Sequence, residues 1–503
     1  MKLKSNKASV EKKFSTLFCC NKKIKVYNNI EKLTLSGDEK MRKHNPSMTE
    51  GPLFGKMMLY TIPIILTGIL QLFFNAADLV IVGQFGQSGS NAVAAVGCTA
   101  SISGLITNFF IGCSAGSGVT VAHAIGAGHN DGVHKAVHTI IPLSIVGGAI
   151  ISVIGILLAE PLLKLMSTPE NIIQLSTIYM QIIFAGMMPN MVYNFGASVL
   201  RAAGDSKRPL YYLVISGIVN VLLNLFFVLV LHMDVAGVAL ATVIAHLLSA
   251  VLVINALMKR TDACKLDIKK IRFYSEPLKR IFRMGIPAGI QSSLFSISNV
   301  IIQSSVNALD AIYVGVVAGN AAAQNLQNFA FMTNEGFKQT AMNYTGQNVG
   351  SRKYDRVLRI SHISLLATAI IGIVVGCVMT YFSKPLLGIY ISDSPEAIRW
   401  GTVRMICMCL PYFVGGIMDV TTGLLRGMGQ SVFPMLASIL GVCVFRVVWI
   451  YTIFTMPQYH TPESLWISYI ISWLLTFIIQ YVVFRVVISK KIKMQKSAVD
   501  TLP

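Results

Sequence analysis

The chain has 503 residues, of which 54% are hydrophobic and only 13% are charged. Soluble domains of this length carry about twice that fraction of charged residues, which excludes a water-soluble globular protein. The net charge of +20 does not indicate nucleic-acid binding, because thirteen of the 42 lysines and arginines lie in residues 1–56 and most others lie in alternate connecting loops. That pattern is typical of the cytoplasmic loops of membrane proteins and predicts contact with anionic lipid headgroups.

The first segment, residues 1–51, is rich in lysine and lacks the apolar core of a cleavable signal peptide. Its composition is typical of a disordered extension, which we expect in the cytoplasm. The apolar chain that follows does not need this segment, which makes Met41 a hypothetical alternative start.

Apolar stretches long enough to cross a bilayer recur from Met57 onward. A hydrocarbon core about 30 Å thick needs roughly 20 residues of helix, and these stretches are too long for the strands of a barrel. The sequence therefore predicts an all-α polytopic membrane protein. Its twelve helices are expected near 57–82, 92–122, 136–160, 171–198, 209–232, 236–258, 281–309, 312–342, 357–383, 397–422, 432–455 and 464–488.

The twelve helices fall into two similar sets of six. Pro63 matches Pro287 at an offset of 224, and Arg201 matches Arg426 at an offset of 225, each within a longer shared motif. Because each copy has an even number of helices, both copies have the same orientation, and the axis relating them runs along the membrane normal. Repeats of this kind build transporters that rock around a cavity near the membrane midplane.

The repeat divides the chain into a six-helix bundle at 52–258, a basic cytoplasmic linker at 259–280, a second six-helix bundle at 281–490 and a cytoplasmic tail at 491–503. The positions of lysine and arginine place both termini in the cytoplasm. We expect a monomer in the inner membrane of a bacterium.

Polar residues within the apolar helices are the candidate functional groups, because an ionised side chain near a helix centre costs at least about 2.5 kcal/mol in a bilayer. In the first helix, Gln71, Asn75 and Asp78 are spaced i, i+4 and i+7, which places them on one face. We predict that the carboxylate of Asp78 binds H⁺ or Na⁺. The alternative is an aspartate close enough to the outer end of the helix to be solvated.

Neutral oxygen donors in the same half are expected to complete this site: Asn220 and Asn224 in the fifth helix, Thr242 in the sixth and Asn194 in the fourth. One carboxylate with neutral oxygens suits a hard monovalent cation. Amides also hold helices together, and each residue alone fits that structural role equally well.

The second copy distinguishes these two roles. At the repeat offsets of 224 and 225, Asp78 corresponds to Ile302, Asn220 to Phe445 and Asn224 to Trp449. A polar set needed only for packing would be expected in both copies. Its presence in one copy favours a single specialised cation site in the N-terminal half.

The second half carries its own polar groups. Gln324 and Asn328 on the eighth helix, together with Gln71, predict a substrate cavity, although hydrogen bonding between helices is the commoner role for such amides. Asp419 on the tenth helix is a further candidate for the substrate cavity, and is otherwise either a second proton site or a buried structural partner. Arg446 on the eleventh helix has no partner that the sequence assigns.

The sequence predicts no cofactor, no enzyme and no metal site other than Na⁺ at Asp78. The histidines from His123 to His138 lie in and beside a glycine-rich loop, with no cysteine or carboxylate at the spacing of metal ligands. No Ser/His or paired-Asp arrangement of a membrane enzyme occurs in the apolar segments. His246, one turn after Thr242, is either a proton carrier or a histidine bonded to a neighbouring helix.

Longer motifs show a family resemblance. From about residue 52 to 490, the sequence resembles the multidrug and toxic compound extrusion (MATE) family. The likeness rests on an Ile-Pro followed by Gln71, Asn75 and Asp78-Leu-Val-Ile-Val-Gly, on Leu200-Arg-Ala-Ala-Gly-Asp-Ser, and on Gln347-Asn-Val-Gly350 and Leu425-Arg-Gly-Met-Gly-Gln-Ser431 in the second half. It implies export of small cationic or amphipathic compounds in exchange for H⁺ or Na⁺, by alternation between inward-open and outward-open states.

The resemblance also assigns residues. It places Asp78, Asn220 and Thr242 on the cation-site positions of the family. Asn224 stands where many members have a second aspartate, which makes H⁺ coupling more plausible than Na⁺ coupling without excluding Na⁺. Related flippases that move lipid-linked oligosaccharides share the architecture and are the alternative function.

Overall fold

The structure, a computed structural model, describes residues 48–166, 168–391 and 394–500. These residues form helices, turns and short connections, with no strand among them. Nearly all of segment 1–51, for which the sequence predicts disorder, lies outside the described residues, as does Met41.

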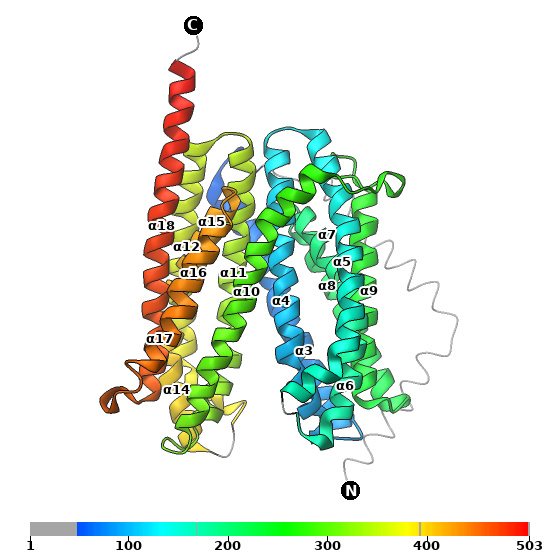
Figure 1. Cartoon of the computed structure of the whole chain (residues 1–503), viewed down its shortest axis with the longest axis vertical. Helices are drawn as coiled ribbons and strands as arrows, with labels where there is room; N and C mark the ends of the chain where they lie inside the picture. Colours follow the sequence, from blue (N-terminus) through cyan, green and yellow to red (C-terminus); the bar gives the residue numbers. More distant parts are fainter. Residues whose placement is uncertain (1–47, 167, 392–393, 501–503) are drawn as a thin grey trace.

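Twelve helical units follow one another in two sets of six, as the hydropathy predicts (Figure 1). The first set consists of α3 (Leu53–Phe85), α4 (Ser90–Gly126), α5 (Asn130–Leu165), the bent pair α6 (Glu170–Ala185) and α7 (Met187–Ala202), α8 (Lys207–Leu225) with its π-helical continuation η1 (Phe226–Val230), and α9 (Asp234–Met258). The second set consists of α10 (Ser275–Leu309), α11 (Val316–Gly350), α12 (Tyr354–Tyr381) followed by the short α13 (Ser383–Gly388), the bent pair α14 (Pro395–Met408) and α15 (Tyr412–Gly427), then α16 (Val432–Ser438), π-helical η3 (Ile439–Val444) and α17 (Phe445–Tyr451) as one unit, and α18 (Pro462–Asp500). The predicted all-α fold with twelve membrane helices is confirmed.

Several helix ends differ from the prediction, and three of them have a clear physical reason. Helix α10, the seventh predicted helix, begins at Ser275, inside the segment 259–280 expected to be linker. A helix can continue into water, and the negative charge of Glu276 in its first turn is stabilised by the positive end of the helix dipole. For the same reason α18 runs on through the expected tail to Asp500, over residues rich in helix-forming lysine. The start of α11 is delayed to Val316 because Gly315, with a φ of 84°, ends the preceding turn.

The linker before α10 contains the 3-10 turn η2 (Ile268–Lys270) and an ion pair of which only the arginine is buried. Arg260, whose side chain is only 4% exposed, pairs with Asp262. Burial alone would raise the pKa of Asp262, but the hydrogen bond and charge of Arg260 lower it below its ordinary value. Cys264 and Leu266 of the linker pack in a buried cluster of the first half, which anchors the linker there.

Nine of the described helices are long and apolar enough to cross a membrane, or eleven when each bent pair counts as one span. The bends measure 45° between α6 and α7 and 47° between α14 and α15. The unit that remains is α11, which carries Asn320, Gln324, Asn328 and the pair Glu335 and Lys338. It packs among α3, α4, α12, α14 and α15, so its polar side chains face other helices or the space between the halves rather than lipid.

Helices α3 and α10 each pass from one half to the other. The start of α3 belongs to a buried cluster of the second half, in which Met57 and Ile64 pack with Phe337 and Tyr344. The end of α3 belongs to a cluster of the first half that includes Val82. In the same way, the start of α10 packs in the first half and its end packs in the second. These two helices therefore connect the interiors of both halves.

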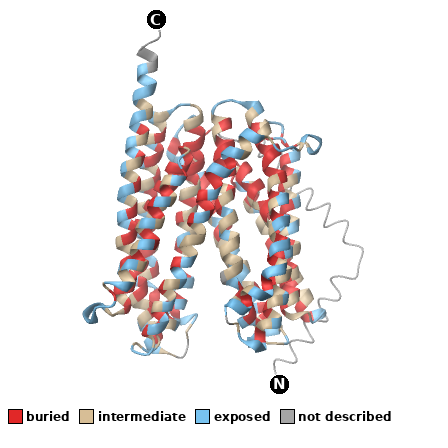
Figure 2. Ribbon diagram, in the orientation of Figure 1, coloured by how far each residue is buried: buried red, intermediate tan, exposed pale blue. Residues whose placement is uncertain are grey.

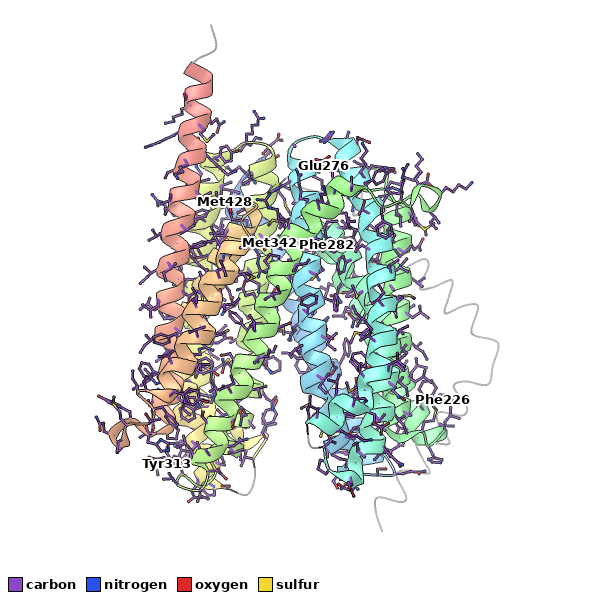
Figure 3. The ribbon with its side chains drawn as sticks, in the orientation of Figure 1. Phe226, Glu276, Phe282, Tyr313, Met342 and Met428 are labelled. Atoms are coloured by element: carbon purple, nitrogen blue, oxygen red, sulfur yellow. The ribbon has the colours of Figure 1, made fainter. Side chains whose placement is uncertain are left out.

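The halves make their closest contacts at the end that carries the basic loops, which we call the closed end. A Cβ on Gly116 of α4 would lie 2.5 Å from the backbone nitrogen of Gly285 of α10, so only glycine permits this approach. Met342 of α11 lies beside this crossing and is buried in a cluster with Met284 and Val119 (Figure 3).

Toward the opposite end, where α6 and α14 lie, the helices of the two halves diverge (Figure 1). We call this the open end. Residues on the inner sides of the helices change from buried near the closed end to half-buried or exposed near the open end (Figure 2). The halves thus form a V that is joined on the side of the basic loops.

Candidate functional site

Asp78 lies on α3 in the first half and is buried. Its carboxylate accepts hydrogen bonds from two other helices: Asn224 Nδ2 donates to Oδ1 at 2.5 Å, and Thr242 Oγ1 donates to Oδ2 at 3.3 Å. Asn220 Nδ2 donates to Thr242 Oγ1 at 3.2 Å, and its Oδ1 accepts from Asn224 Nδ2 at 3.3 Å. The structure brings these four predicted residues together, and we call them the coupling cluster.

Local packing explains how α8 reaches Asp78. A Cβ on Gly217 would lie only 1.9 Å from Cε2 of Phe74, so the absence of a side chain lets the Phe74 ring of α3 lie against α8. Asn220 and Asn224 follow at i+3 and i+7 from that glycine and so lie near the same face of α8. The residues beyond them are apolar: Ile81, Val82, Val228 and Val238 form a buried cluster.

One atom of the coupling cluster lacks a partner. Asn224 Oδ1 is buried and accepts no hydrogen bond among the described residues. Leaving a buried acceptor unpaired costs about 1–3 kcal/mol. A proton on the Asp78 carboxyl group or a cation beside it would supply the missing donor or positive charge. Carboxylate, amide and hydroxyl oxygens are also the ligand types that hard monovalent cations prefer.

Asn75 and Gln71 are not part of this cluster. Both side chains are exposed, and Asn75 lies three residues before Asp78, which turns it about 60° away from the carboxylate around the helix. Gln71 lies on the face of α3 that carries Met57 and Ile64, the residues that pack against the second half nearer the closed end. No hydrogen bond joins Asn75 to the coupling cluster among the described residues, so its contribution to the cation site stays a prediction.

Asn194 also lies elsewhere. Its Nδ2 donates to Asn190 Oδ1 at 2.6 Å, one turn earlier on α7. Asn190 in turn lies 3.5 Å from His246 Nδ1 on α9. These residues form a second polar group within the first half, and His246 takes the role of a histidine bonded to a neighbouring helix. The sequence offered a signal for this group in the i, i+4 spacing of the two asparagines.

The predicted cavity residues of the second half lie on α11 and α15. Gln324 is exposed, and Asn328 and Asp419 are half-buried. The Phe73 ring of α3 lies 5.6 Å from the Phe329 ring of α11, which places this stretch of α11 next to the first half. The structure therefore keeps Gln324 and Asn328 close to the interface between the halves.

Sequence reasoning missed a polar connection between the halves. Arg201 Nη1 of α7 donates to Gln339 Oε1 of α11 at 3.0 Å, and Gln339 Nε2 donates to Glu335 Oε1 at 3.1 Å. Glu335 also forms an ion pair with Lys338. The sequence signals were Arg201, a basic residue in a motif that both halves share, and the i, i+3 spacing of Glu335 and Lys338, which predicts their pairing.

Other amides of α11 have the structural role that the sequence left open. Arg404 of α14 donates to Asn320 Oδ1 at 2.7 Å and to Gln327 Oε1 at 3.0 Å. Arg404 is buried, so these amides satisfy a cation inside the second half. They hold α14 to α11 and do not face a cavity.

Comparisons with known proteins agree with this fold. The sequence model of the MatE family matches residues 63–226 and 287–452, one match in each half and together more than half of the chain. The probable multidrug resistance protein YoeA of Bacillus subtilis is 26% identical over 462 residues, which cover 90% of this chain and 96% of that protein. The probable multidrug resistance protein NorM of Thermotoga maritima is 24% identical over 402 residues, covering 78% of this chain and 84% of its own. A solved outward-facing multidrug resistance MATE transporter superposes with a TM-score of 0.81 at 22% identity, over 89% of this chain and 98% of that one.

Proposed function

Since the chain belongs to the MATE family, and is thus a multidrug efflux transporter rather than an enzyme, we propose that it is a secondary antiporter that exports small organic, often cationic, compounds in exchange for H⁺ or Na⁺. Transport proceeds by alternating access, with no cofactor other than the coupling ion. The protein lies in the inner membrane of a bacterium as a monomer with both termini in the cytoplasm. The closed end is then cytoplasmic, and the V opens outward.

The observation that carries the proposal is the coupling cluster. When Asp78 is ionised, Asn224 and Thr242 donate to it. When Asp78 is protonated, its O–H needs an acceptor. A half-turn of the Asn224 amide would present Oδ1, a buried acceptor without a partner, in place of Nδ2. The cluster therefore offers hydrogen-bonding groups to both forms of one carboxyl group, which is what a site that gains and loses a cation requires.

We favour H⁺ as the coupling ion. The cluster holds a single carboxylate, so a bound Na⁺ would be held by one charge and three neutral oxygens. A proton needs only the carboxylate and one acceptor. Na⁺ stays the alternative, because Asn220, Asn224 and Thr242 together supply three neutral oxygens.

Helix α3 gives the site a route to the rest of the molecule. It carries Asp78 in the first half, while its first turns pack in the second half. Between them lies Pro63, which has no N–H to bond the carbonyl one turn earlier and so weakens the helix at that point. A change of charge at Asp78 can thus alter the contact between the halves through one helix.

The substrate is expected to bind where the halves diverge. We expect Gln71, Gln324 and Asn328 to face this region together with Phe73 and Phe329, which would offer amide and aromatic surface. Asp419, half-buried on α15, is the carboxylate that would pair with a cationic substrate.

Export of lipid-linked oligosaccharides has less support. A pyrophosphate needs free cationic groups, and two of the three candidate cations in the membrane already have partners: Lys338 pairs with Glu335, and Arg404 bonds amides. The third, Arg446, is enclosed within the second half. A small organic substrate therefore fits the described residues better.

The test is exchange in reconstituted vesicles. Efflux of a fluorescent organic cation would be followed under an imposed pH gradient and then under a Na⁺ gradient, with wild type beside Asp78→Asn. Gradient-driven efflux that the variant loses supports the proposal and names the ion. If neither gradient moves any tested cation in wild type, drug export is rejected in favour of lipid-linked substrates.

A further inference from the structure

Arg446 of α17 is a buried cation with few partners. The residue is 3% exposed, and its Nε donates to Ser472 Oγ of α18 at 3.0 Å. Its Nη2 has no hydrogen-bond partner among the described residues. The guanidinium carbon lies 3.7 Å from the centre of the Tyr469 ring and 5.7 Å from that of Trp473. A positive charge in the membrane interior is thus held by two ring faces and one hydroxyl.

No carboxylate balances this charge among the described residues that surround it. The ionisable groups that act on Arg446 are Tyr469, Cys443 and Tyr412, and none of them is an acid of the aspartate or glutamate kind. Burying an unpaired charge is costly, and a structural arginine would normally be paired. The position calls for a specific reason.

The internal repeat supplies one. Helix α8 begins at Lys207 and α16 begins at Val432, which keeps the offset of 225 found in the preceding motif. At this offset Asn220 corresponds to Phe445. Between Val432 and Phe445, however, lies the π-helical segment η3, and a π-bulge accommodates one extra residue in a helix. In the first half the π-helical segment η1 comes only after Asn224.

The extra residue changes the correspondence on the fifth helix of the repeat. After η3, the residue that occupies the angular position of Asn220 is Arg446 rather than Phe445. The hydrogen bonds agree with this shift: Asn220 donates to a hydroxyl of the following helix, Thr242, at 3.2 Å, and Arg446 donates to a hydroxyl of its following helix, Ser472, at 3.0 Å.

The carboxylate has no such counterpart. Asp78 corresponds to Ile302 of α10, which is buried and apolar. On the fifth helix of the repeat, the second half thus has the guanidinium of Arg446 where the first half has the amide of Asn220. On the first helix of the repeat, it has Ile302 where the first half has the carboxylate of Asp78. Where the first half has a negative group that can receive a cation, the second half has a cation of its own.

We propose that Arg446 is a permanent, covalently attached cation that occupies the second half's counterpart of the coupling cluster. The proposal rests on the proposed function only in its interpretation of the first half. It assigns the exchangeable ion to the first half alone and keeps the charge of the second half constant through the transport cycle. The Tyr469 and Trp473 rings with the Ser472 hydroxyl then form an organic-cation site whose ligand is the arginine side chain itself.

The first test removes the tether. In purified Arg446→Ala, free methylguanidinium should enter the vacated site and restore part of the thermal stability that the substitution removes. An equal concentration of Na⁺ or methylammonium should not, because neither has a planar face to stack on the ring. Wild type should gain nothing from methylguanidinium, because the arginine side chain already fills the site.

A second pair of variants decides the matter if Arg446→Ala cannot be purified. Arg446→Lys keeps the charge, and Arg446→Met keeps much of the volume without it. Exchange rates and melting temperatures closer to wild type in the lysine variant support the proposal. A methionine variant that equals or exceeds the lysine variant overturns it, as does an Arg446→Ala protein that methylguanidinium fails to stabilise. Rescue of stability does not depend on Asp78, so failure of ion coupling in the vesicle assay leaves this outcome separate.

Discussion

Helices α3 and α10 occupy equivalent places in the two halves but are held to their neighbours in different ways. At the offset of 224, Thr61 corresponds to Gly285 and Thr340 to Gly116. The crossing of α10 with α4 is a direct contact of glycine backbones, while the same crossing of α3 with α11 is a hydrogen bond of 2.8 Å between Thr61 Oγ1 and Thr340 Oγ1. Helix α10 is thus held by close backbone packing. Helix α3 is held by a hydrogen bond whose donor and acceptor can take other partners.

The helix with the exchangeable contact is also the helix with the carboxylate. Asp78 lies on α3, and its counterpart on α10 is Ile302. Tyr60 adds a further bond across the halves, since its hydroxyl accepts from Asn343 Nδ2 of α11 at 3.0 Å. The repeat has thus kept one packing scheme, and we infer that the copy of the helix with the carboxylate is also the copy that can move.

The largest expected effect comes from removing the charge on α3. Asp78→Asn should reduce gradient-driven efflux about 5- to 150-fold, the range of a coupling free energy of about 1–3 kcal/mol. The amide keeps the shape of the side chain but cannot change its charge. Ile302→Val on α10 is the matched control and should leave the response close to wild type. Equal losses in both variants, measured in vesicles, would remove the contrast between the helices.

The next effect concerns the rigid crossing. Gly116→Val should destabilise the joined state of the halves by about 1–3 kcal/mol, because its side chain would overlap the backbone of Gly285. Gly104→Val on the same helix is the control, since a Cβ there meets nothing within 4 Å. Melting temperatures of the two purified variants provide the measurement. A Gly104 variant that loses as much stability would show that valine in α4, rather than the crossing, is responsible.

A third prediction adds charge to the half that already has it. Asn224→Asp places a second carboxylate within hydrogen-bonding distance of the first and should strengthen the response to a Na⁺ gradient about tenfold, or ~1.4 kcal/mol in ion affinity. The Na⁺ dependence of efflux at constant pH is the readout. Phe445→Tyr in the second half, which adds a polar group without a carboxylate, should leave that dependence unchanged. No gain in the aspartate variant would contradict the assignment of ligands to the cluster.

Hydropathy was sufficient to predict the twelve helices, because lipid imposes a minimum length of apolar residues on each span. It also selected Asp78, Asn220, Asn224 and Thr242, because polar side chains inside apolar helices are costly and therefore few. It could not exclude Asn194, because side chains on different helices meet according to tilt and rotation, which a single sequence does not give.

Two further features were beyond the sequence for related reasons. The π-helical segment η3 shifts the repeat by one residue without any break in the apolar pattern. The constant offset of the sequence repeat therefore pairs Phe445 with Asn220. The bond between Arg201 and Gln339 joins residues 138 positions apart and depends on how the halves dock. Local periodicity predicts which face a residue lies on, but not which helix that face meets.

The smallest expected effect is at the exchangeable crossing itself. Each threonine hydroxyl has an acceptor on its own helix, Met57 O for Thr61 and Gly336 O for Thr340, at 2.7 and 2.9 Å. Since a hydroxyl has one proton, the bond between the helices competes with these local bonds. Its loss in Thr61→Val should therefore cost only about 0.5–1.5 kcal/mol.

A double-mutant cycle isolates that bond. Thr61→Val and Thr340→Val each remove it, and the double variant replaces both hydroxyls with methyl groups of similar shape, so it should be no less stable than either single variant. If α3 moves during transport, the same variants should change the exchange rate while Gly104→Val does not. A coupling energy of zero between the two threonines would mean that α3 is held by packing as firmly as α10, and the mobility assigned to α3 would then have to come from Pro63 alone.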